Sequence, residues 1–200
     1  MVAAEPPLPS PKGLVLVSGP SRSGKSRWAE HLAAISGRPV LYLATGPQRP
    51  SDPSWQERLR LHRQRRPASW DTLEVGGGLG TVLAELRLQP DPPRGGPQRP
   101  LLLIDSLGTW LSHHLDCDSE VWDGVQEQLL LELRQIAQPV LLVSEEVGWG
   151  VVPPTAIGGR FRDRLGSLQQ RLMVQCHAAW LVVQGRALDL HALGRAVPDR

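Results

Sequence analysis

The sequence predicts an α/β fold in which helices flank a central, mostly parallel sheet. Short apolar runs rich in Leu and Val alternate with longer segments of helical pattern, which is the order of strand–helix units. The apolar runs are nearly continuous, as expected for strands that are covered on both faces. A length of 200 residues with 40% hydrophobic residues suits one domain with a sizeable core.

Five apolar runs are expected to be strands, and five other segments are expected to be helices. The expected strands are residues 14–18, 39–45, 100–105, 139–144 and 178–184, and the segment WDTLE, ending at Glu74, is also strand-like. The expected helices are roughly residues 25–36, 55–63, 79–88, 119–137 and 160–177. Residues 89–100 are rich in proline and glycine and should form a surface excursion within one domain of residues 14–192. Residues 1–13 and 193–200 are expected to be a loose leader and a loose tail.

Composition narrows the classes of function. The chain carries 22 basic and 20 acidic residues, a net charge of +2, so any basic function must be local. Cys117 and Cys176 lack metal-ligand spacing and are more typical of buried thiols than of a disulfide, which suits a reducing, cytoplasmic location. The leader has four prolines and no apolar core, unlike a signal peptide. No apolar run approaches the ~20 residues of a membrane span.

A phosphate-binding loop follows the first expected strand. The octapeptide GPSRSGKS matches the pattern G-x-x-x-x-G-K-[ST] in full, with a strand before it and a helix after it, as that motif requires. Its residues are Gly19, Pro20, Ser21, Arg22, Ser23, Gly24, Lys25 and Ser26. Both glycines are expected to supply unusual dihedrals and close approach, while Pro20 removes one backbone donor. Lys25 would reach the β- and γ-phosphates of a nucleotide, and Ser26 would ligate Mg²⁺.

An acidic residue ends a second buried strand, where a P-loop enzyme needs a partner for the metal. Asp105 closes the run LLLID and could hold Mg²⁺ directly or through water. The alternative is that Asp105 and Ser106 only cap a helix that begins at LGTWL. Together the two motifs predict an enzyme or a switch that binds a nucleoside triphosphate, without naming the acceptor. The expected fold is of the P-loop NTPase, RecA-like type.

The segment RLRLHRQRR, residues 58–66, contains five arginines, no acidic residue and one histidine, His62. Alone, it could be a solvated basic face, a nucleic-acid patch or a phosphate site. At helical spacing His62 shares a face with Leu59, which suits a half-buried structural histidine as well as a nucleophile. Pro67 should keep Arg66 out of the helix, and the last arginines should lie on a turn beyond the helix end.

Six segments occur in an order that resembles one enzyme family. They are SGPSRSGKSRWAE, LYLATG, RLRLHRQRRPASWDTLE, LLLIDSLGTWLS, LLVSEEVGWGVVP and GRFRDRLGSLQQRL. Over residues 14–185 the chain is similar to the adenosylcobinamide kinase / adenosylcobinamide-phosphate guanylyltransferase family of cobalamin biosynthesis. The phosphate loop is common to many families, whereas the combination of H-x-x-x-R-P-x-x-W, D-x-L-x-x-W-L-S and S-E-E-V-G-x-G-V-V-P is far more specific.

The resemblance implies two reactions in one protein. The first phosphorylates the aminopropanol hydroxyl of adenosylcobinamide with ATP or GTP. The second transfers GMP from GTP onto the new phosphate through a guanylylated histidine, which matches His62 here. The family's nucleotide contacts fall on residues 19–26 and on Ala44, Thr45, Gly46, Arg63, Gln64, Arg65, Arg66, Glu74 and Asp105. A homotrimer is a further implication of the resemblance.

The chemistry of these residue types agrees with the implied reactions. A neutral imidazole nitrogen of His62 can attack the α-phosphorus of GTP and expel pyrophosphate, giving a phosphoramidate. Neighbouring arginines would neutralise phosphate charge and disfavour the imidazolium form. Glu74 could accept hydrogen bonds from a ribose or a guanine edge, or could be an exposed strand-end carboxylate. Glu145 or Glu146 could orient the acceptor hydroxyl or a metal-bound water, or their loop could be a solvated turn.

The C-terminal half offers further candidates and several departures from the family pattern. His113, His114, Arg160 and Arg162 are candidates for lining the corrinoid site. Gln169 stands where the family usually has Asn, the family has an Asp near the position of His177, and the segment RALDLHALG lacks the family's lysine. These departures put subunit packing or substrate contacts in doubt, but they leave the phosphate loop and His62 intact.

Three other functions compete with this assignment. A simple P-loop small-molecule kinase would use the same loop, with His62 as a structural residue. A nucleotide-dependent nucleic-acid-binding protein would use the arginines, but the near-neutral charge and the lack of a second basic stripe argue against a nucleic-acid partner. A non-catalytic GTP switch would need a guanine-specificity motif of that class, and the sequence has none that is recognisable.

Overall fold

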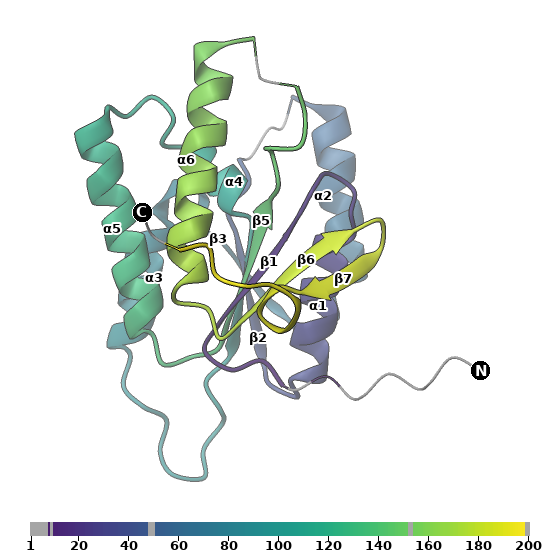
Figure 1. Cartoon of the computed structure of the whole chain (residues 1–200). Helices are drawn as coiled ribbons and strands as arrows, with labels where there is room; N and C mark the ends of the chain where they lie inside the picture. Colours follow the sequence, from purple (N-terminus) through teal and green to yellow (C-terminus); the bar gives the residue numbers. More distant parts are fainter. Residues whose placement is uncertain (1–7, 9, 48–50, 152–153, 199–200) are drawn as a thin grey trace.

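A computed structural model of the chain describes residue 8 and residues 10–47, 51–151 and 154–198, while the side chains at positions 55, 58 and 62 are outside that description. Among the described residues, seven strands form one sheet in the order β3-β2-β4-β5-β1-β6-β7 (Figure 1). All neighbouring strands are parallel except β6 and β7. The predicted α/β class with a mostly parallel sheet is therefore confirmed.

The elements follow one another in strand–helix alternation. The strands are β1 (Leu14–Gly19), β2 (Val40–Ala44), β3 (Asp71–Glu74), β4 (Leu101–Asp105), β5 (Val140–Glu145), β6 (Ala178–Val183) and β7 (Arg186–Asp189). The helices are α1 (Lys25–Ile35), α2 (Pro53–Arg65), α3 (Leu79–Leu88), α4 (Leu107–Ser112), α5 (Ser119–Gln135), α6 (Ala156–Met173) and α7 (Leu190–Leu193), with a 3₁₀ turn at Gly76–Gly78. Within the described ranges, no helix has the length and apolar character needed to cross a membrane.

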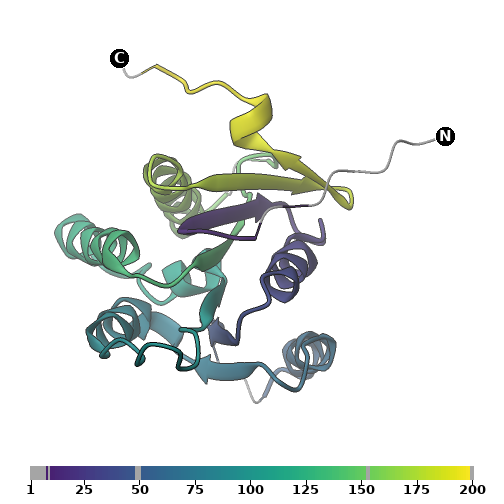
Figure 2. The same ribbon diagram turned by 90° about the horizontal axis from the view of Figure 1, so that it is seen from below.

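Helices cover both faces of the sheet. α1 and α2 lie on one face and α3, α5 and α6 on the other, as Figure 2 shows from below. Successive side chains of a strand point to opposite faces. Leu14 and Leu16 accordingly pack in a cluster with α3, α4, α5 and α6, whereas Val15 and Val17 pack in a second cluster with α1. Each central strand is thus buried on both faces, which explains the nearly continuous apolar runs.

Several helix boundaries differ from the sequence expectation. α2 runs to Arg65, so among the last arginines of the basic segment only Arg66 lies beyond the helix. α6 begins at Ala156 rather than at position 160, because the side chain of Thr155 accepts a backbone hydrogen bond and caps it. α6 ends at Met173 rather than at position 177.

β7 and α7 add to the expected elements, and α4 is the helix that was expected only in the capping alternative for Asp105 and Ser106. β7 pairs with β6 through a two-residue turn in which Gln184 and Gly185 both have positive φ (49° and 76°). α4 begins at Leu107 with Ser106 as its N-cap, because the Ser106 side chain accepts from the Thr109 N–H and the Thr109 side chain accepts from the Ser106 N–H. The capping alternative is therefore correct for Ser106, and it leaves the Asp105 carboxylate for another role.

The carboxyl ends of the parallel strands meet at one edge of the sheet, the upper edge in Figure 1. β5 lies between β1 and β4. Gly19 is in register with Glu145, and Asp105 is in register with Val143 and with Ala44. The phosphate loop, Asp105 and the two glutamates at the end of β5 therefore share this edge. Residues 89–100 form the expected surface excursion at the opposite edge.

Candidate active site

The phosphate loop joins β1 to α1. Gly24 precedes the helix with a φ of 102°, in the left-handed region that glycine enters without strain. Lys25 is buried, and its Nζ donates to the carbonyl oxygen of Pro20 at 3.4 Å. The Lys25 N–H donates to Ser23 Oγ at 3.3 Å. The loop thus curls around its own lysine at the N-terminus of an 11-residue helix, where backbone donors favour anions.

β6 and the turn that follows it support the loop from one side. The N–H of Gly185 donates to the carbonyl oxygen of Ser23 at 3.0 Å. A Cβ atom on Gly19 would lie 2.3 Å from the carbonyl oxygen of Val182 and 2.7 Å from Ser23 Oγ. Gly19 therefore serves close approach, and of the two loop glycines only Gly24 has a positive φ. The expectation of unusual dihedrals at both glycines is wrong for Gly19.

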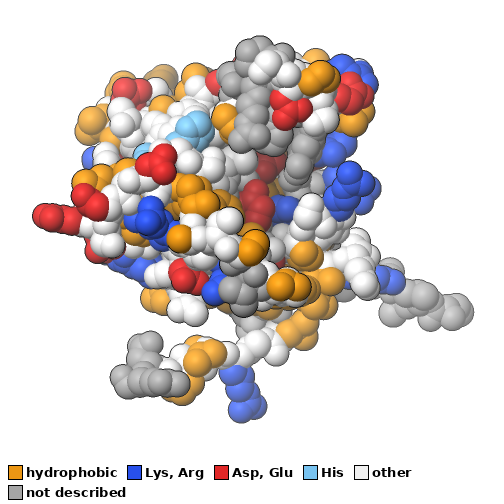
Figure 3. Space-filling view, turned by 90° about the horizontal axis from the view of Figure 1, so that it is seen from above, with side chains coloured by type: hydrophobic (Ala, Val, Ile, Leu, Met, Phe, Trp, Pro, Cys, Tyr) orange, Lys and Arg blue, Asp and Glu red, His pale blue; other side chains and the backbone are white. Residues whose placement is uncertain are grey.

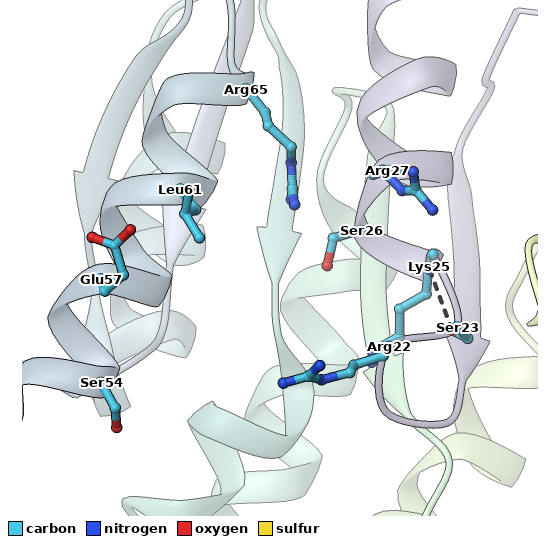
Figure 4. A pocket seen from close by; sticks show the side chains of 10 residues that line it. Arg22, Ser23, Lys25, Ser26, Arg27, Ser54, Glu57, Leu61 and Arg65 are labelled. Carbon is cyan, nitrogen blue, oxygen red and sulfur yellow. Dashed lines mark hydrogen bonds between the residues drawn. The ribbon is translucent and has the colours of Figure 1, made fainter.

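A cavity of about 660 Å³, here called the loop cavity, lies between the phosphate loop and α2. Figure 4 shows Arg22 reaching from the loop toward α2 and Arg65 pointing from the end of α2 into the same space. The other lining residues are Ser23, Gly24, Lys25, Ser26, Arg27, Ser54, Glu57 and Leu61. Four cationic side chains and one carboxylate make this lining basic, which suits a polyanion such as a triphosphate.

A second cavity of about 320 Å³, here called the edge cavity, adjoins the loop cavity at Lys25 and Ser26, which line both. The predicted site residues that line it are Ser21, Lys25, Ser26, Ala44, Gly46, Arg63, Arg66, Glu74 and Asp105. Its lining is completed by Tyr42, Leu59, Ser106, Thr109, Glu145, Glu146 and Val147. Seen from above in Figure 3, acidic and basic side chains lie close together in the middle of this face.

Four of the predicted nucleotide contacts line neither cavity. Gly19 and Pro20 lie in the loop outside both linings. Thr45 is fully buried, and its Oγ1 donates to the Ser106 carbonyl oxygen and accepts from the Ser106 N–H, each at 2.7 Å. Gln64 lines a separate depression along another face of α2. Thr45 therefore links β2 to the start of α4, and its nucleotide contact, like that of Gln64, stays a prediction.

Asp105 is held by Tyr42, the single tyrosine of the sequence. The Tyr42 hydroxyl donates to Asp105 Oδ2 at 2.9 Å. The guanidinium carbon of Arg66 lies 3.6 Å from the centroid of the Tyr42 ring. Burial, and then the Asp105 charge, raises the pKa of Tyr42 well above its usual value, so the hydroxyl remains a donor. Sequence reasoning missed Tyr42, although a polar-tipped residue inside the apolar run VLYLA was the available signal.

Two other arginines of the basic segment pair with glutamates. Arg63 Nη2 lies 3.0 Å from Glu74 Oε1, and both side chains are exposed. Arg65 Nη2 lies 3.1 Å from Oε1 of Glu30, whose side chain is only 13% exposed. Burial raises the pKa of Glu30, and Arg65 opposes that shift. For Glu74 to bind a ribose or a guanine edge, its exposed pair with Arg63 would have to open, which costs little.

The four corrinoid candidates lie on α6 and around the end of α4. Arg160, His113 and His114 each contact a backbone carbonyl oxygen, at 2.9, 3.1 and 3.1 Å. Burial lowers the pKa of His114, so its ring is neutral near pH 7. Arg162 lines a cavity of about 400 Å³ with Leu115, Val147, Thr155, Ile157, Gly158 and Phe161. This cavity shares Val147 with the edge cavity.

Position 62 falls within α2, between Leu61, which lines the loop cavity, and Arg63, which lines the edge cavity. The side chain of His62 lies outside the described residues, so its role as nucleophile stays a prediction. The neighbouring Leu59, expected on the same helix face, lines the edge cavity.

The residues present fit a Mg²⁺ ion whose shell is completed by substrate phosphates. Ser26 and Asp105 line the same cavity. The described residues contain no cluster of three or more His, Cys, Asp or Glu that could hold a metal on its own. Mg²⁺ typically uses one or two protein oxygens together with waters and phosphates. A site with few protein ligands is therefore in keeping with its expected chemistry.

The loop after β1, the aspartate at the end of β4 and the mostly parallel sheet define a P-loop NTPase fold. Among solved structures, the chain is similar to an ATPase from the type III secretion system of pathogenic bacteria, with a TM-score of 0.53 and 10% identity. The match covers 92% of this chain and 59% of that one. At this identity the similarity shows the fold alone.

Sequence comparison then gives the particular family. A family model described as cobinamide kinase / cobinamide phosphate guanyltransferase matches residues 15–190. The chain is 39% identical over 176 residues to the bifunctional adenosylcobalamin biosynthesis protein CobP of Pseudomonas aeruginosa, covering 88% of this chain and 95% of that protein. It is 33% identical over 186 residues to the bifunctional protein CobU of Salmonella typhimurium, covering 86% and 96%. The chain belongs to this family, and the resemblance is confirmed.

Proposed function

We propose that this chain phosphorylates the aminopropanol hydroxyl of adenosylcobinamide with ATP or GTP and then transfers GMP from GTP to the new phosphate, giving adenosylcobinamide-GDP. The observation that carries the proposal is the pair of cavities that meet at Lys25 and Ser26 in a member of this family. The loop cavity offers cations to a triphosphate. The edge cavity brings carboxylates to the same phosphate loop, where an acceptor can approach.

In the first reaction, the loop amides and Lys25 hold the β- and γ-phosphates. The acceptor hydroxyl oxygen attacks the γ-phosphorus and loses its proton to a base. The bond from the γ-phosphorus to the bridging oxygen breaks, and the nucleoside diphosphate leaves. When bound, Mg²⁺ supplies neutralisation of phosphate charge, and Ser26 and Asp105 are the residues that would hold it. Tyr42 supports this role by donating to one Asp105 oxygen.

In the second reaction, His62 acts as the nucleophile. Its neutral ring nitrogen attacks the α-phosphorus of GTP, the bond to the α–β bridging oxygen breaks, and pyrophosphate leaves. A phosphate oxygen of adenosylcobinamide phosphate then attacks the same phosphorus and breaks the phosphorus–nitrogen bond, which frees the imidazole. Arg65 and Arg22, which line the loop cavity, would neutralise the developing charge on the phosphates.

The test is covalent labelling with α-labelled GTP. The intact protein should take up acid-labile, base-stable label, and His62→Ala should take up none while still phosphorylating adenosylcobinamide. His191→Ala is the matched control, because His191 is exposed on α7 and lines neither cavity. A protein that phosphorylates adenosylcobinamide but never takes up label would leave the simple-kinase alternative as the better assignment.

Further parts of the proposal concern the setting of the enzyme. We propose that residues 14–192 act as one domain outside the leader 1–13 and the tail 193–200, and that the enzyme works in the cytoplasm as a homotrimer without a nucleic-acid partner. Family membership supports the trimer, and the net charge of +2 supports the proposal that no nucleic acid is a partner. Light scattering should give three times the mass of the chain, and a gel-shift assay in low salt should detect no complex with DNA or RNA.

A further inference from the structure

Two consecutive glutamates end and follow β5, directly beside the phosphate loop. Glu145 is in register with Gly19 on the neighbouring strand β1. The N–H of Glu146 donates to the carbonyl oxygen of Gly19, the first residue of the loop, at 2.9 Å. Both side chains line the edge cavity. The sequence left open whether Glu145 or Glu146 orients the acceptor hydroxyl. The hydrogen bonds of the two side chains differ, and they indicate which of the two is available for that role.

Glu145 is occupied by the start of α4. One of its oxygens accepts from the Ser106 hydroxyl, and the other accepts from the Gly108 N–H at 2.8 Å. The fit is close, because a Cβ atom on Gly108 would lie 2.3 Å from Glu145 Oε2. Both oxygens of this carboxylate therefore hold the turn between β4 and α4. Glu145 is a structural link that fixes the Asp105–Ser106 corner.

Glu146 has a different set of contacts. Its Oε1 accepts from Gln169 Nε2 on α6, at 3.3 Å. The same Gln169 nitrogen lies 2.9 Å from Ser144 Oγ and 3.0 Å from the Glu145 carbonyl oxygen, so its two hydrogens are shared among three acceptors and hold it against β5. An ionised carboxylate accepts about four hydrogen bonds, so these contacts leave capacity for a substrate hydroxyl. Glu146 is half-buried and lines the edge cavity, next to a second opening toward α6.

We propose that Glu146 is the catalytic base of the phosphorylation step, with Gln169 as its positioning residue. The Glu146 carboxylate takes the proton of the acceptor hydroxyl as the hydroxyl oxygen bonds to the γ-phosphorus and the bond to the β–γ bridging oxygen breaks. The nucleoside diphosphate leaves with that electron pair, and Glu146 later returns its proton to water. This inference rests on the proposed function and assigns one residue within it.

The electrostatic setting of Glu146 agrees with such a role. Burial raises the pKa of Glu146, while hydrogen bonds from Gln169 and Ser18 oppose that shift. A carboxylate with a raised pKa is a better proton acceptor near neutral pH. The charged groups that line the same cavities are Lys25, Arg63, Arg66, Glu74, Asp105 and Glu145 in the edge cavity, and Arg162 and Asp163 of α6 in the second opening.

The test uses Glu146→Gln, which keeps an oxygen that can accept from Gln169. With saturating ATP and adenosylcobinamide, its kcat for phosphorylation should fall about 100-fold or more, with the KM for ATP nearly unchanged. The variant should still take up label from α-labelled GTP and still pass GMP to adenosylcobinamide phosphate made by the wild-type protein. Retention of labelling also shows that the variant is folded. Glu85→Gln, on the exposed face of α3, is the matched control and should behave as wild type.

A pH profile distinguishes a base from a merely structural glutamate. Phosphorylation by the wild type should decline below the pKa of Glu146, and Glu146→Gln should lack that acidic limb. Gln169→Ala removes a hydrogen bond that lowers this pKa, so its acidic limb should move to higher pH.

Wild-type kcat in Glu146→Gln would overturn the assignment, and so would an equal loss of phosphorylation and labelling. A wild-type protein that makes no adenosylcobinamide phosphate would instead overturn the proposed function itself.

Discussion

Replacing Gly19 by alanine should destabilise the fold and disable the phosphate loop together. The new Cβ atom would lie 2.3 Å from the carbonyl oxygen of Val182, whereas carbon and oxygen atoms ordinarily approach to roughly 3.3 Å. Val182 belongs to β6 and is buried, so its backbone cannot move aside freely. The loop and β6 must therefore separate by about 1 Å.

The expected losses of stability and of phosphorylation rate follow from this overlap. Overpacking of this kind costs about 1–3 kcal/mol. A domain of this size loses roughly 2–4 °C in Tm per kcal/mol, so we expect a fall of about 2–12 °C. A displacement of ~1 Å also moves Lys25 relative to the triphosphate, which costs on the order of 100-fold in the rate of phosphorylation.

The assay combines thermal unfolding, followed by circular dichroism, with the rate of adenosylcobinamide phosphorylation. Gly124→Ala is the matched control, because a Cβ atom there meets no other atom within 4 Å. Gly124 lies inside α5, where alanine should stabilise the protein by roughly 0.5–1 kcal/mol. If Gly19→Ala melts and phosphorylates as wild type does, the loop is not held against β6 as described.

Two further outcomes test the site and the core. Tyr42→Phe removes the hydroxyl that donates to Asp105 but keeps the ring against Arg66. It should lower the free energy of unfolding by about 1.5 kcal/mol, because a hydrogen bond to a charged group is lost and water would replace only part of it. A urea titration should show this as a lower midpoint with an unchanged slope, and an unchanged midpoint would contradict it. Burial raises the pKa of the Cys176 thiol to about 12, so iodoacetamide at pH 8 should leave Cys176 unmodified until the protein is unfolded. Mass spectrometry that finds alkylated Cys176 in the native protein would contradict this prediction.

The sequence predicted the strands that are buried on both faces, because burial leaves a local signal in consecutive apolar residues. β1, β4 and β5 are of this kind. β7 has no such signal, since it is the outermost strand beside β6 and its residues RALD are exposed or half-buried. Its formation depends on the turn at Gln184 and Gly185, where two residues with positive φ suit a hairpin. A two-residue connection ending in glycine was the signal that could have predicted it.

The site was predictable where the chemistry is contiguous in sequence, and less so where it depends on packing. The phosphate loop and Asp105 stand in continuous motifs beside buried strands. Tyr42 and Asp105 meet across 63 positions of the chain, and Gln169 and Glu146 across 23, so neither pair could be inferred from spacing. The different roles of Glu145, which is bound to the start of α4, and Glu146 could not be inferred from spacing either. Only the fold assigns these adjacent and chemically identical residues to different tasks.

The two cavities also bear on how one phosphate loop can serve two reactions. Both border Lys25 and Ser26, so a triphosphate held there is open to approach from the sheet edge and from α2. Attack on the γ-phosphorus leaves a diphosphate, and attack on the α-phosphorus leaves pyrophosphate, so one nucleotide cannot supply both products. On the proposed function, each round therefore consumes two triphosphates. Because the proposed base lines the edge cavity and the proposed nucleophile lies on α2, loss of one activity need not abolish the other.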